Sequence, residues 1–352
     1  MSGNLKELIL QSSKSVDVTL YVGGTLILSE TYYPGNGNLI HVDFTEVVET
    51  YLSFNLPSSD VFVQAELARM FNFNCTADSV VTTGSFTAIR SGKLHLNEAA
   101  SQFLTENFLT WQPNDKPVTY YSPEYLTYYA TQACAIKVRA YFEDGSNSVV
   151  TLVSPTEGSC YTLNMQYGVI SGKFSGRHPM YYDVWVENTS GARLSYVQRY
   201  RASEKQSEDE CWYLFENSLG GLDCVRAYGS IKDTPEYTYN IANIGDISEE
   251  YRVDCQRLHV RNTGYLSPQE SRWLQDLFVS RQKYVYTISG IYKIVFTGGD
   301  GNSDSANLPD SYSFTYRYAD DRPFLDIQRR TDLPANLVIP VPTGDTFFYP
   351  HG

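Results

Sequence analysis

The sequence predicts an all-β, mainly antiparallel protein that consists of tandem β-sandwich domains with short helices. Apolar and polar residues alternate in short runs, for example in residues 16–21 (VDVTLY), as they do in half-buried strands. Turn signals such as Gly23-Gly24 separate neighbouring runs, which is typical of β-hairpins. The 29 tyrosines and 17 phenylalanines also favour pleated, half-buried surfaces. A chain of 352 residues with these features is expected to contain more than one domain.

Residues 1–103 are expected to form an N-terminal β-sandwich with one short helical insert. The alternating runs predict strands at 16–21, 25–28, 39–44, 61–65 and 82–89. The turn-forming residues 34–38 (PGNGN) separate the second of these strands from the third. A helix is predicted at 45–52 because the apolar residues of this segment share one side of it.

Residues 104–130 combine aromatic residues and prolines, unlike the flanking blocks. Pro113, Pro117 and Pro123 exclude a central strand across these positions, because proline cannot donate a ladder hydrogen bond. We interpret the segment as an aromatic and proline-rich linker that lies along a domain surface. The alternative is a ligand platform, because tyrosine and tryptophan rings offer rigid amphipathic faces to sugars or peptides.

Residues 131–325 are expected to form a second β-rich domain, with a division into two sandwiches near residues 201–210 as an option. A hairpin is predicted from strands at 135–142 and 148–153. Further strands are expected at 161–167, 181–186, 195–200, 211–215, 224–228, 251–260, 285–297 and 312–317.

Residues 326–352 contain four prolines and are expected to form an extended C-terminal arm. Phe347, Phe348 and Tyr349 near its end are candidate assembly contacts. An arm that is already stiff loses little conformational entropy when it docks on its own domain or on a neighbouring subunit.

One amphipathic helix is predicted near residues 267–280. Ser267 and Glu270 have the spacing of a capping box, and the proline between them suits the first helical position. Trp273 and Leu277 belong to an apolar stripe along this helix. Because predicted strands flank the helix on both sides, we expect the stripe to pack within its own domain rather than to bind a partner.

The composition argues against several classes of function. The 40 Asp and Glu residues outnumber the 27 Lys and Arg residues, and the net charge of −13 disfavours binding to nucleic acid or to an anionic membrane surface. No stretch has the roughly 18 to 20 continuous apolar residues of a membrane span, and residues 1–10 lack the apolar core of a signal peptide. The six cysteines are scattered without a C-x-x-C pair, so we expect a reducing compartment.

The sequence shows none of the common catalytic motifs. It contains no G-x-S-x-G, Walker A, H-E-x-x-H or calcium-loop pattern, and its five histidines are isolated from one another. Asp300 and Asp304 lie in a glycine-rich loop whose oxygen atoms could bind a metal, but such loops are more often only solvated. We therefore expect no enzyme, no cofactor and no metal site, with metal binding at Asp300 and Asp304 left open.

Three runs in the second half carry a resemblance to a known group of proteins. They are residues 212–221 (WYLFENSLGG), residues 261–266 (RNTGYL) leading into 273–277 (WLQDL), and residues 312–320 (YSFTYRYAD). These runs resemble the uncharacterised β-rich virion or tail proteins encoded by phages and prophages of Bacteroidales. The resemblance covers about residues 210–325 and implies a structural role in a tail or baseplate-like assembly, with no catalytic residues.

The sequence therefore predicts a structural component of a phage tail or tail-like particle, either a tail or baseplate adaptor or an assembly protein. The residues of its expected structural motif are Asn217, Gly220, Gly221, Asn262, Gly264, Tyr265, Ser267, Glu270, Trp273 and Leu277. The expected partners are other virion or tail proteins and further copies of the chain, with synthesis in the host cytoplasm and assembly into the particle. The alternative is a carbohydrate-binding module for cell-surface or receptor attachment, which would bind glycans through exposed aromatic rings.

Overall fold

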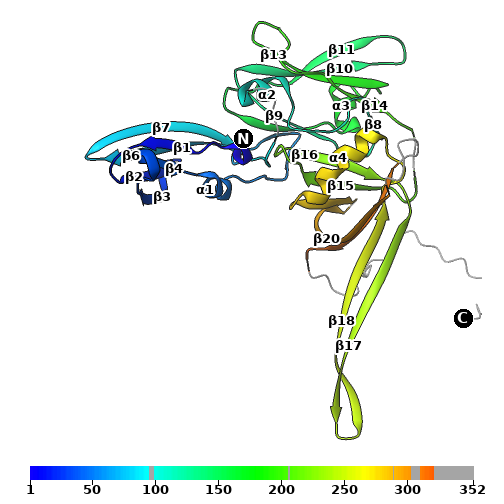
Figure 1. Cartoon of the computed structure of the whole chain (residues 1–352). Helices are drawn as coiled ribbons and strands as arrows, with labels where there is room; N and C mark the ends of the chain where they lie inside the picture. Colours follow the sequence, from blue (N-terminus) through cyan, green and yellow to red (C-terminus); the bar gives the residue numbers. More distant parts are fainter. Residues whose placement is uncertain (95–98, 205–206, 288, 303–309, 321–352) are drawn as a thin grey trace, which may run out of the picture. The chain divides into compact units, whose positions relative to one another are not determined.

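The computed structural model describes residues 1–352 except for 95–98, 205–206, 288, 303–309 and 321–352. Met1–Ala319 form one compact unit. The described residues fold into five β-sheets with four α-helices (Figure 1), which confirms the predicted all-β, mainly antiparallel class. The predicted C-terminal arm at 326–352, with Phe347, Phe348 and Tyr349, lies outside the described residues.

The N-terminal residues form a small sandwich of two sheets. One sheet pairs β1 (Leu8–Gln11) with β4 (Leu39–Val42), and the other has the order β3-β2-β6-β7. Apolar side chains of β2 and β4 share one buried core with Val48 of helix α1 (Thr45–Thr50). The strands of the second sheet are β2 (Val16–Val22), β3 (Thr25–Tyr32), β6 (Ala68–Ala77) and β7 (Val80–Ile89), and 3-10 turns lie at Ser2–Asn4 and Asn36–Asn38.

A three-stranded sheet joins segments that we expected to belong to three different parts of the chain. Its order is β5-β12-β9, formed by β5 (Val61–Val63), β12 (Cys160–Asn164) and β9 (Tyr125–Tyr129). This sheet crosses the boundaries that we predicted near residues 103 and 130. All of β9 is buried, so this stretch does not lie along a domain surface as the linker prediction required. Its aromatic rings enter the core because burial of their large apolar area is favourable.

A five-stranded sheet has the order β11-β10-β13-β14-β8. Its inner face packs with β9 and with helix α3 (Tyr167–Lys173) in one apolar core. The edge strand β8 pairs in parallel with β14 and contains Pro117, which an edge position tolerates. The strands are β8 (Lys116–Val118), β10 (Cys134–Tyr141), β11 (Asn147–Val153), β13 (Tyr181–Asn188) and β14 (Gln198–Ala202), and helix α2 (Ala100–Glu106) precedes them.

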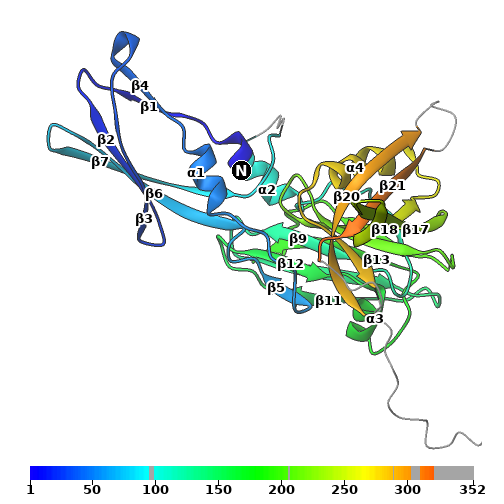
Figure 2. The ribbon, with the colours of Figure 1, turned by 90° about the horizontal axis from the view of Figure 1, so that it is seen from below.

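A seven-stranded sheet has the order β16-β15-β19-β20-β21-β18-β17. Its strands are β15 (Cys211–Glu216), β16 (Leu222–Ala227), β17 (Ile231–Ile244), β18 (Ile247–Asn262), β19 (Lys283–Thr287), β20 (Gly290–Asn302) and β21 (Ser311–Tyr318). Helix α4 (Pro268–Val279) packs on this sheet (Figure 2) through Trp273, Leu274 and Leu277. The capping box predicted for Ser267 and Glu270 is present, so the predicted helix start is confirmed.

Candidate functional site

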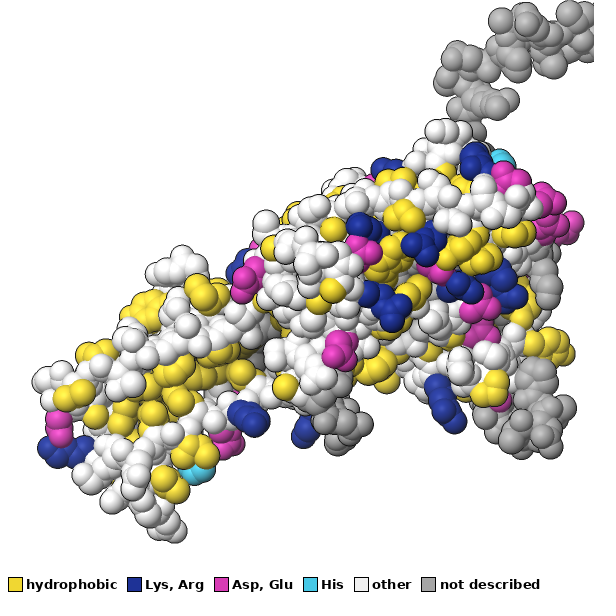
Figure 3. Space-filling model, turned by 90° about the horizontal axis from the view of Figure 1, so that it is seen from above, with side chains coloured by type: hydrophobic (Ala, Val, Ile, Leu, Met, Phe, Trp, Pro, Cys, Tyr) yellow, Lys and Arg dark blue, Asp and Glu magenta, His cyan; other side chains and the backbone are white. Residues whose placement is uncertain are grey.

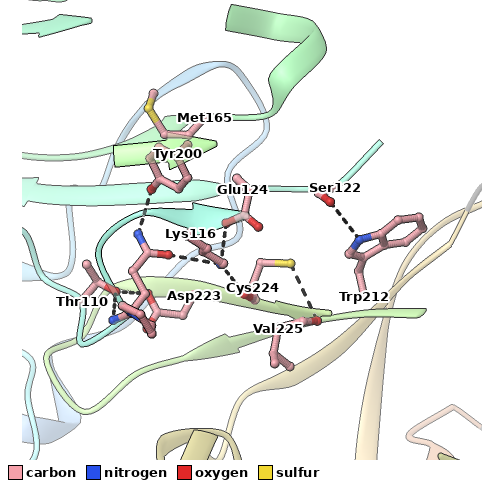
Figure 4. A network of polar contacts seen from close by, with 12 residues as sticks. Thr110, Lys116, Ser122, Glu124, Met165, Tyr200, Trp212, Asp223, Cys224 and Val225 are labelled. Atoms are coloured by element: carbon pink, nitrogen blue, oxygen red, sulfur yellow. Dashed lines mark hydrogen bonds and ion pairs between the residues drawn. The ribbon is translucent and has the colours of Figure 1, made fainter. Parts of the chain in front are cut away.

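A buried polar network links strands of two sheets with Glu124, which directly precedes β9 (Tyr125–Tyr129) of a third sheet (Figure 4). Nζ of Lys116 in β8 donates to Oε2 of Glu124 at 2.7 Å and to Oε1 of Gln112 at 3.2 Å. The third acceptor is the backbone oxygen of Cys224 in β16, at 2.6 Å. Nε2 of Gln112 donates to the hydroxyl of Tyr200 in β14 at 2.8 Å. Each of the three protons of the Lys116 ammonium can therefore meet an acceptor.

A second buried acid in this network, Asp223, holds helix α4. Its Oδ1 accepts a hydrogen bond from Oγ1 of Thr110 at 2.7 Å, and its Oδ2 accepts one from Nε1 of Trp273 at 2.7 Å. Nζ of Lys116 lies 4.8 Å from the centre of the Trp273 ring, within the range of a cation–π contact. The tryptophan thus attaches α4 both to an anion and to a cation.

Burial determines the direction of the pKa shift for the two acids of this network. It raises the pKa of Glu124 to about 7, although the positive charge of Lys116 opposes the change. It also raises the pKa of Asp223 to about 6, although hydrogen bonds from side chains such as Trp273 and Thr110, and the charge of Lys116, lower it. For Lys116 burial lowers the pKa, but the negative charge of Glu124 contributes to a larger opposite effect, and the pKa is raised.

The network contains acid and base groups but offers no access to a substrate. Lys116, Glu124 and Asp223 are only 7, 3 and 0 % exposed, and none of them lines either surface groove considered below. A general acid or base must come within about 3 Å of the proton that it transfers. We therefore assign the network a structural role: it connects three sheets and α4.

The first group of predicted motif residues forms the turn between β15 and β16. Oδ1 of Asn217 accepts hydrogen bonds from the backbone N–H groups of Leu219 at 3.0 Å and Gly221 at 2.9 Å, while its Nδ2 donates to the oxygen of Leu109 at 2.8 Å. A β-carbon at Gly221 would lie 2.0 Å from that oxygen, so no larger residue fits. Gly220 has a φ of +84°, in the left-handed region that favours glycine.

The second group surrounds the start of α4. Oδ1 of Asn262 accepts a hydrogen bond from the N–H of Gly264 at 2.8 Å, and the backbone oxygen of Tyr265 accepts one from the hydroxyl of Tyr228. The remaining motif residues cap or bury this helix: Ser267, Glu270, Trp273 and Leu277. The structure thus gives these residues contacts that shape turns and pack a helix.

An open groove with an aromatic lining lies at the ends of β8 and β14, with a volume of about 720 Å³. Tyr120 and Tyr121 are 49 and 65 % exposed, and their ring centroids lie 5.0 Å apart. Nε1 of Trp212 donates to Oγ of Ser122 at 3.2 Å, which orients the indole ring. The lining residues are Val118, Thr119, Tyr120, Tyr121, Tyr167, His178, Ala202, Ser203, Glu204, Ser207, Glu210 and Trp212. Exposed rings beside hydroxyl and carboxylate groups suit the recognition of a sugar.

Other contacts fix the polar side of this groove. Oε2 of Glu210 accepts a hydrogen bond from Nη2 of Arg226 at 2.7 Å, and the rings of Tyr167 and His178 are stacked at 6.2 Å. From the sequence, the alternative interpretation of residues 104–130 is a ligand platform, and these residues include two of the tyrosines of the groove. It gave no sign that Trp212 and Glu210 would join them, because the pairing of distant strands brings these residues together.

A smaller groove of about 380 Å³ lies beside α4. It is lined by Trp111, Pro113, Gln269, Arg272, Trp273 and Asp276. Nε1 of Trp111 donates to Oγ of Ser218 at 2.9 Å, and this serine donates to Oδ2 of Asp276 at 2.8 Å. These side chains already form hydrogen bonds with one another, so they are less available to bind a ligand in the groove.

Strands β17 and β18 form a long hairpin that is exposed on both faces. Only His259–Asn262 of β18 pair with β21, so in the described part of the chain residues 234–258 pair solely with each other. These residues form a ribbon of roughly 40 Å that extends beyond the rest of its sheet (Figure 1). Its apolar side chains, between 44 and 70 % exposed, are those of Tyr237, Tyr239, Ile241, Ile244, Ile247, Tyr251 and Val253.

Neither a metal centre nor a membrane helix is found among the residues that the structure describes. Within these residues no group of three or more His, Cys, Asp or Glu side chains is placed to bind a metal ion. Asp304 and the side chain of Asp300 lie outside them. No described helix combines the length and the apolar content that crossing a bilayer requires.

Comparisons with known proteins give no family for the chain. No protein-family model matches the sequence, and no curated protein matches it. Its function is therefore argued from the geometry of the hairpin and of the grooves.

Proposed function

We propose that the protein is a structural subunit of a multi-protein assembly, namely a component of a phage tail or tail-like particle, and not an enzyme. The observation that supports this proposal best is the exposed hairpin β17–β18. An isolated two-stranded hairpin is at best marginally stable in water. Large exposed apolar side chains in contiguous positions are typical of surfaces that another protein covers. A neighbouring subunit would cover these exposed side chains.

The narrower part of the proposal, a place in a tail or baseplate, rests on the resemblance of residues 210–325. The hairpin lies within this region. Other tail proteins and further copies of the chain are the expected partners, with assembly after synthesis in the host cytoplasm.

Light scattering over a concentration series, followed by negative-stain imaging, tests the assembly. The native chain is expected to form a defined oligomer, ring or tube. Ile244→Thr/Ile247→Thr keeps the β-branched shape at the hairpin end but removes apolar surface at side chains that are 67 and 70 % exposed, so its oligomer is expected to dissociate. Ile9→Thr in β1, at a side chain that is 58 % exposed, is the matched control and should assemble like the native chain. A native chain that stays monomeric at all concentrations would contradict self-assembly.

The aromatic groove supports a second candidate function, binding of a glycan. Tyr120, Tyr121 and Trp212 offer ring faces to a sugar beside the Glu210 carboxylate. Tyr121→Ala should remove binding to any oligosaccharide that the native chain captures on a glycan array, whereas Tyr33→Ala, at another exposed tyrosine, should leave it intact. An array on which the native chain binds no sugar would exclude this function.

A further inference from the structure

The outer face of the five-stranded sheet carries a layer of arginine and aromatic side chains. Strand register places Arg139 of β10 opposite Asp183 of β13, and Asp183 opposite Arg199 of β14. The next row contains Tyr141 and Tyr181, whose rings are stacked at 4.4 Å. Figure 3 views the molecule from the side on which β10, β11 and β13 appear in Figure 1, and it shows Lys and Arg side chains among hydrophobic ones.

Cations lie over the rings of this layer. The guanidinium of Arg139 lies 5.2 Å from the centre of the Trp185 ring, and that of Arg199 lies 4.4 Å from the centre of Tyr181. These contacts hold the long side chains against the sheet. Arginine, tryptophan and tyrosine are also the residues that contribute most to binding in protein interfaces. We call this layer the arginine–aromatic face.

The arginine–aromatic face is positive although the chain is acidic. Its charged residues are Lys137, Arg139, Arg193, Arg199 and Arg201 against Asp115, Asp183 and Glu187, a net charge of +2 in a chain of net charge −13. Lys137, Arg199 and Arg201 each form an ion pair with one of these carboxylates. Arg139 forms no ion pair with a described residue, and its Nε is buried without a hydrogen-bond acceptor there. The face therefore favours an anionic partner.

The end of the hairpin is acidic and apolar, so its charge is opposite to that of the arginine–aromatic face. Residues 241–251 contain Asp246, Glu249 and Glu250 and no Lys or Arg. The same segment presents four large exposed apolar side chains: Ile241, Ile244, Ile247 and Tyr251. An acidic and apolar tip matches a surface of arginine and aromatic rings in both charge and contact chemistry.

We propose that the hairpin tip of one copy of the chain docks on the arginine–aromatic face of a second copy. This inference rests on the proposed assembly function and names the two surfaces that make the contact. Because the two surfaces differ, the contact is heterologous, and repetition of it gives a ring or a filament.

A charge-swap experiment on the full-length chain tests this pairing. Glu249→Lys/Glu250→Lys makes the tip positive, and Arg139→Glu/Arg201→Glu makes the face negative. Either variant alone is expected to raise the dissociation constant of self-association by about tenfold or more, because the matching charges become repulsive. An equimolar mixture of the two is expected to assemble again, because each tip then meets a face of opposite charge.

The controls separate charge from folding. Glu46→Lys/Glu49→Lys on α1 makes the same change in net charge as the tip variant, at an exposed site, and should assemble like the native chain. Circular dichroism and thermal melting must show that every variant is folded. If the folded variants assemble as the native chain does, or if the mixture fails to restore assembly, the pairing is overturned.

The experiments also distinguish a failure of this pairing from a failure of the proposed assembly function. Loss of assembly in Ile244→Thr/Ile247→Thr with no effect of the charge variants would support a hairpin contact but place it on another surface. A monomeric native chain would instead remove self-assembly altogether.

Discussion

At the scale of single residues, the buried ammonium of Lys116 has a large unfavourable desolvation, because only 7 % of the residue is exposed. Removal of a charge from water costs several kcal/mol, and a nearby opposite charge offsets this only if good hydrogen bonds complete the geometry. Lys116 has that geometry, with Glu124, Gln112 and the Cys224 carbonyl as acceptors. We expect the pair to specify how the sheets meet more than to stabilise the fold.

Removal of one partner tests this view. Lys116→Met leaves Glu124 buried without its cation and should lower the free energy of unfolding by about 3–5 kcal/mol at pH 8. The folded-state pKa of Glu124 is raised to about 7, so its favourable contribution is present at low pH and is lost as the pH rises from about 4.5 towards 7. At pH 5 the carboxyl is protonated in the folded chain, so the effect of Lys116→Met should be smaller. Urea denaturation at both pH values measures the difference.

The double variant Lys116→Met/Glu124→Leu is the control for this prediction. Replacement of a buried ion pair by apolar residues of similar volume is often neutral or stabilising. The double variant should therefore unfold at a higher urea concentration than Lys116→Met at pH 8. Equal loss in the two variants would show that packing, and not the uncompensated charge, determines the effect.

The sequence could not reveal this network. Lys116 and Glu124 lie in the stretch that we interpreted as a linker, and Asp223 is about a hundred residues away. Their contact depends on the pairing of distant strands, about which the local sequence carries no information. The residues around Asn217 and Gly221 indicate a turn in the sequence, but the Leu109 carbonyl that contacts both of them lies about a hundred residues earlier.

At the scale of elements, helix α4 was predictable because its signals are local. A serine, a proline and a glutamate within four positions specify its start, and an apolar stripe specifies its buried face. Strand β17 was missed for the opposite reason. It contains Pro235 and is exposed on both faces, so no alternation between buried and exposed positions marks it. An element without a core-facing side leaves a weak pattern in the sequence.

The capping box gives a prediction at this scale. Ser267→Ala removes the hydrogen bond that Oγ of Ser267 accepts from the N–H of Glu270, and it should lower the free energy of unfolding by about 1 kcal/mol. Glu270→Gln is the matched variant, because glutamine at this position can still bond back to the N–H of Ser267. Chemical denaturation should show a clear loss for the alanine variant and a much smaller one for the glutamine variant. A similar loss in both would indicate that the charge of Glu270 matters more than the hydrogen bonds.

At the scale of the molecule, the all-β class follows from the alternation pattern, whereas the domain boundaries do not. Sheet β5-β12-β9 takes one strand from each of three predicted segments. The guanidinium of Arg90 also forms an ion pair with Glu216 and donates to the oxygen of Leu52 at 2.9 Å, which ties the early and late parts of the chain together. A boundary predicted from composition assumes that neighbours in sequence share a core, and here distant strands share one.

Fragments of the chain test this architecture. A fragment of residues 131–319 lacks β8 and β9 together with both charges of the Lys116–Glu124 pair, so the four remaining strands of the five-stranded sheet would lose the part of their core that β9 supplies. We expect it to aggregate or to show no cooperative thermal transition by near-ultraviolet circular dichroism. A fragment of residues 104–319 retains these strands, loses only the edge strand β5 from the three-stranded sheet, and should unfold cooperatively at a lower temperature than the full chain. Cooperative unfolding of the shorter fragment at the temperature of the longer one would restore residues 104–130 to the role of a linker.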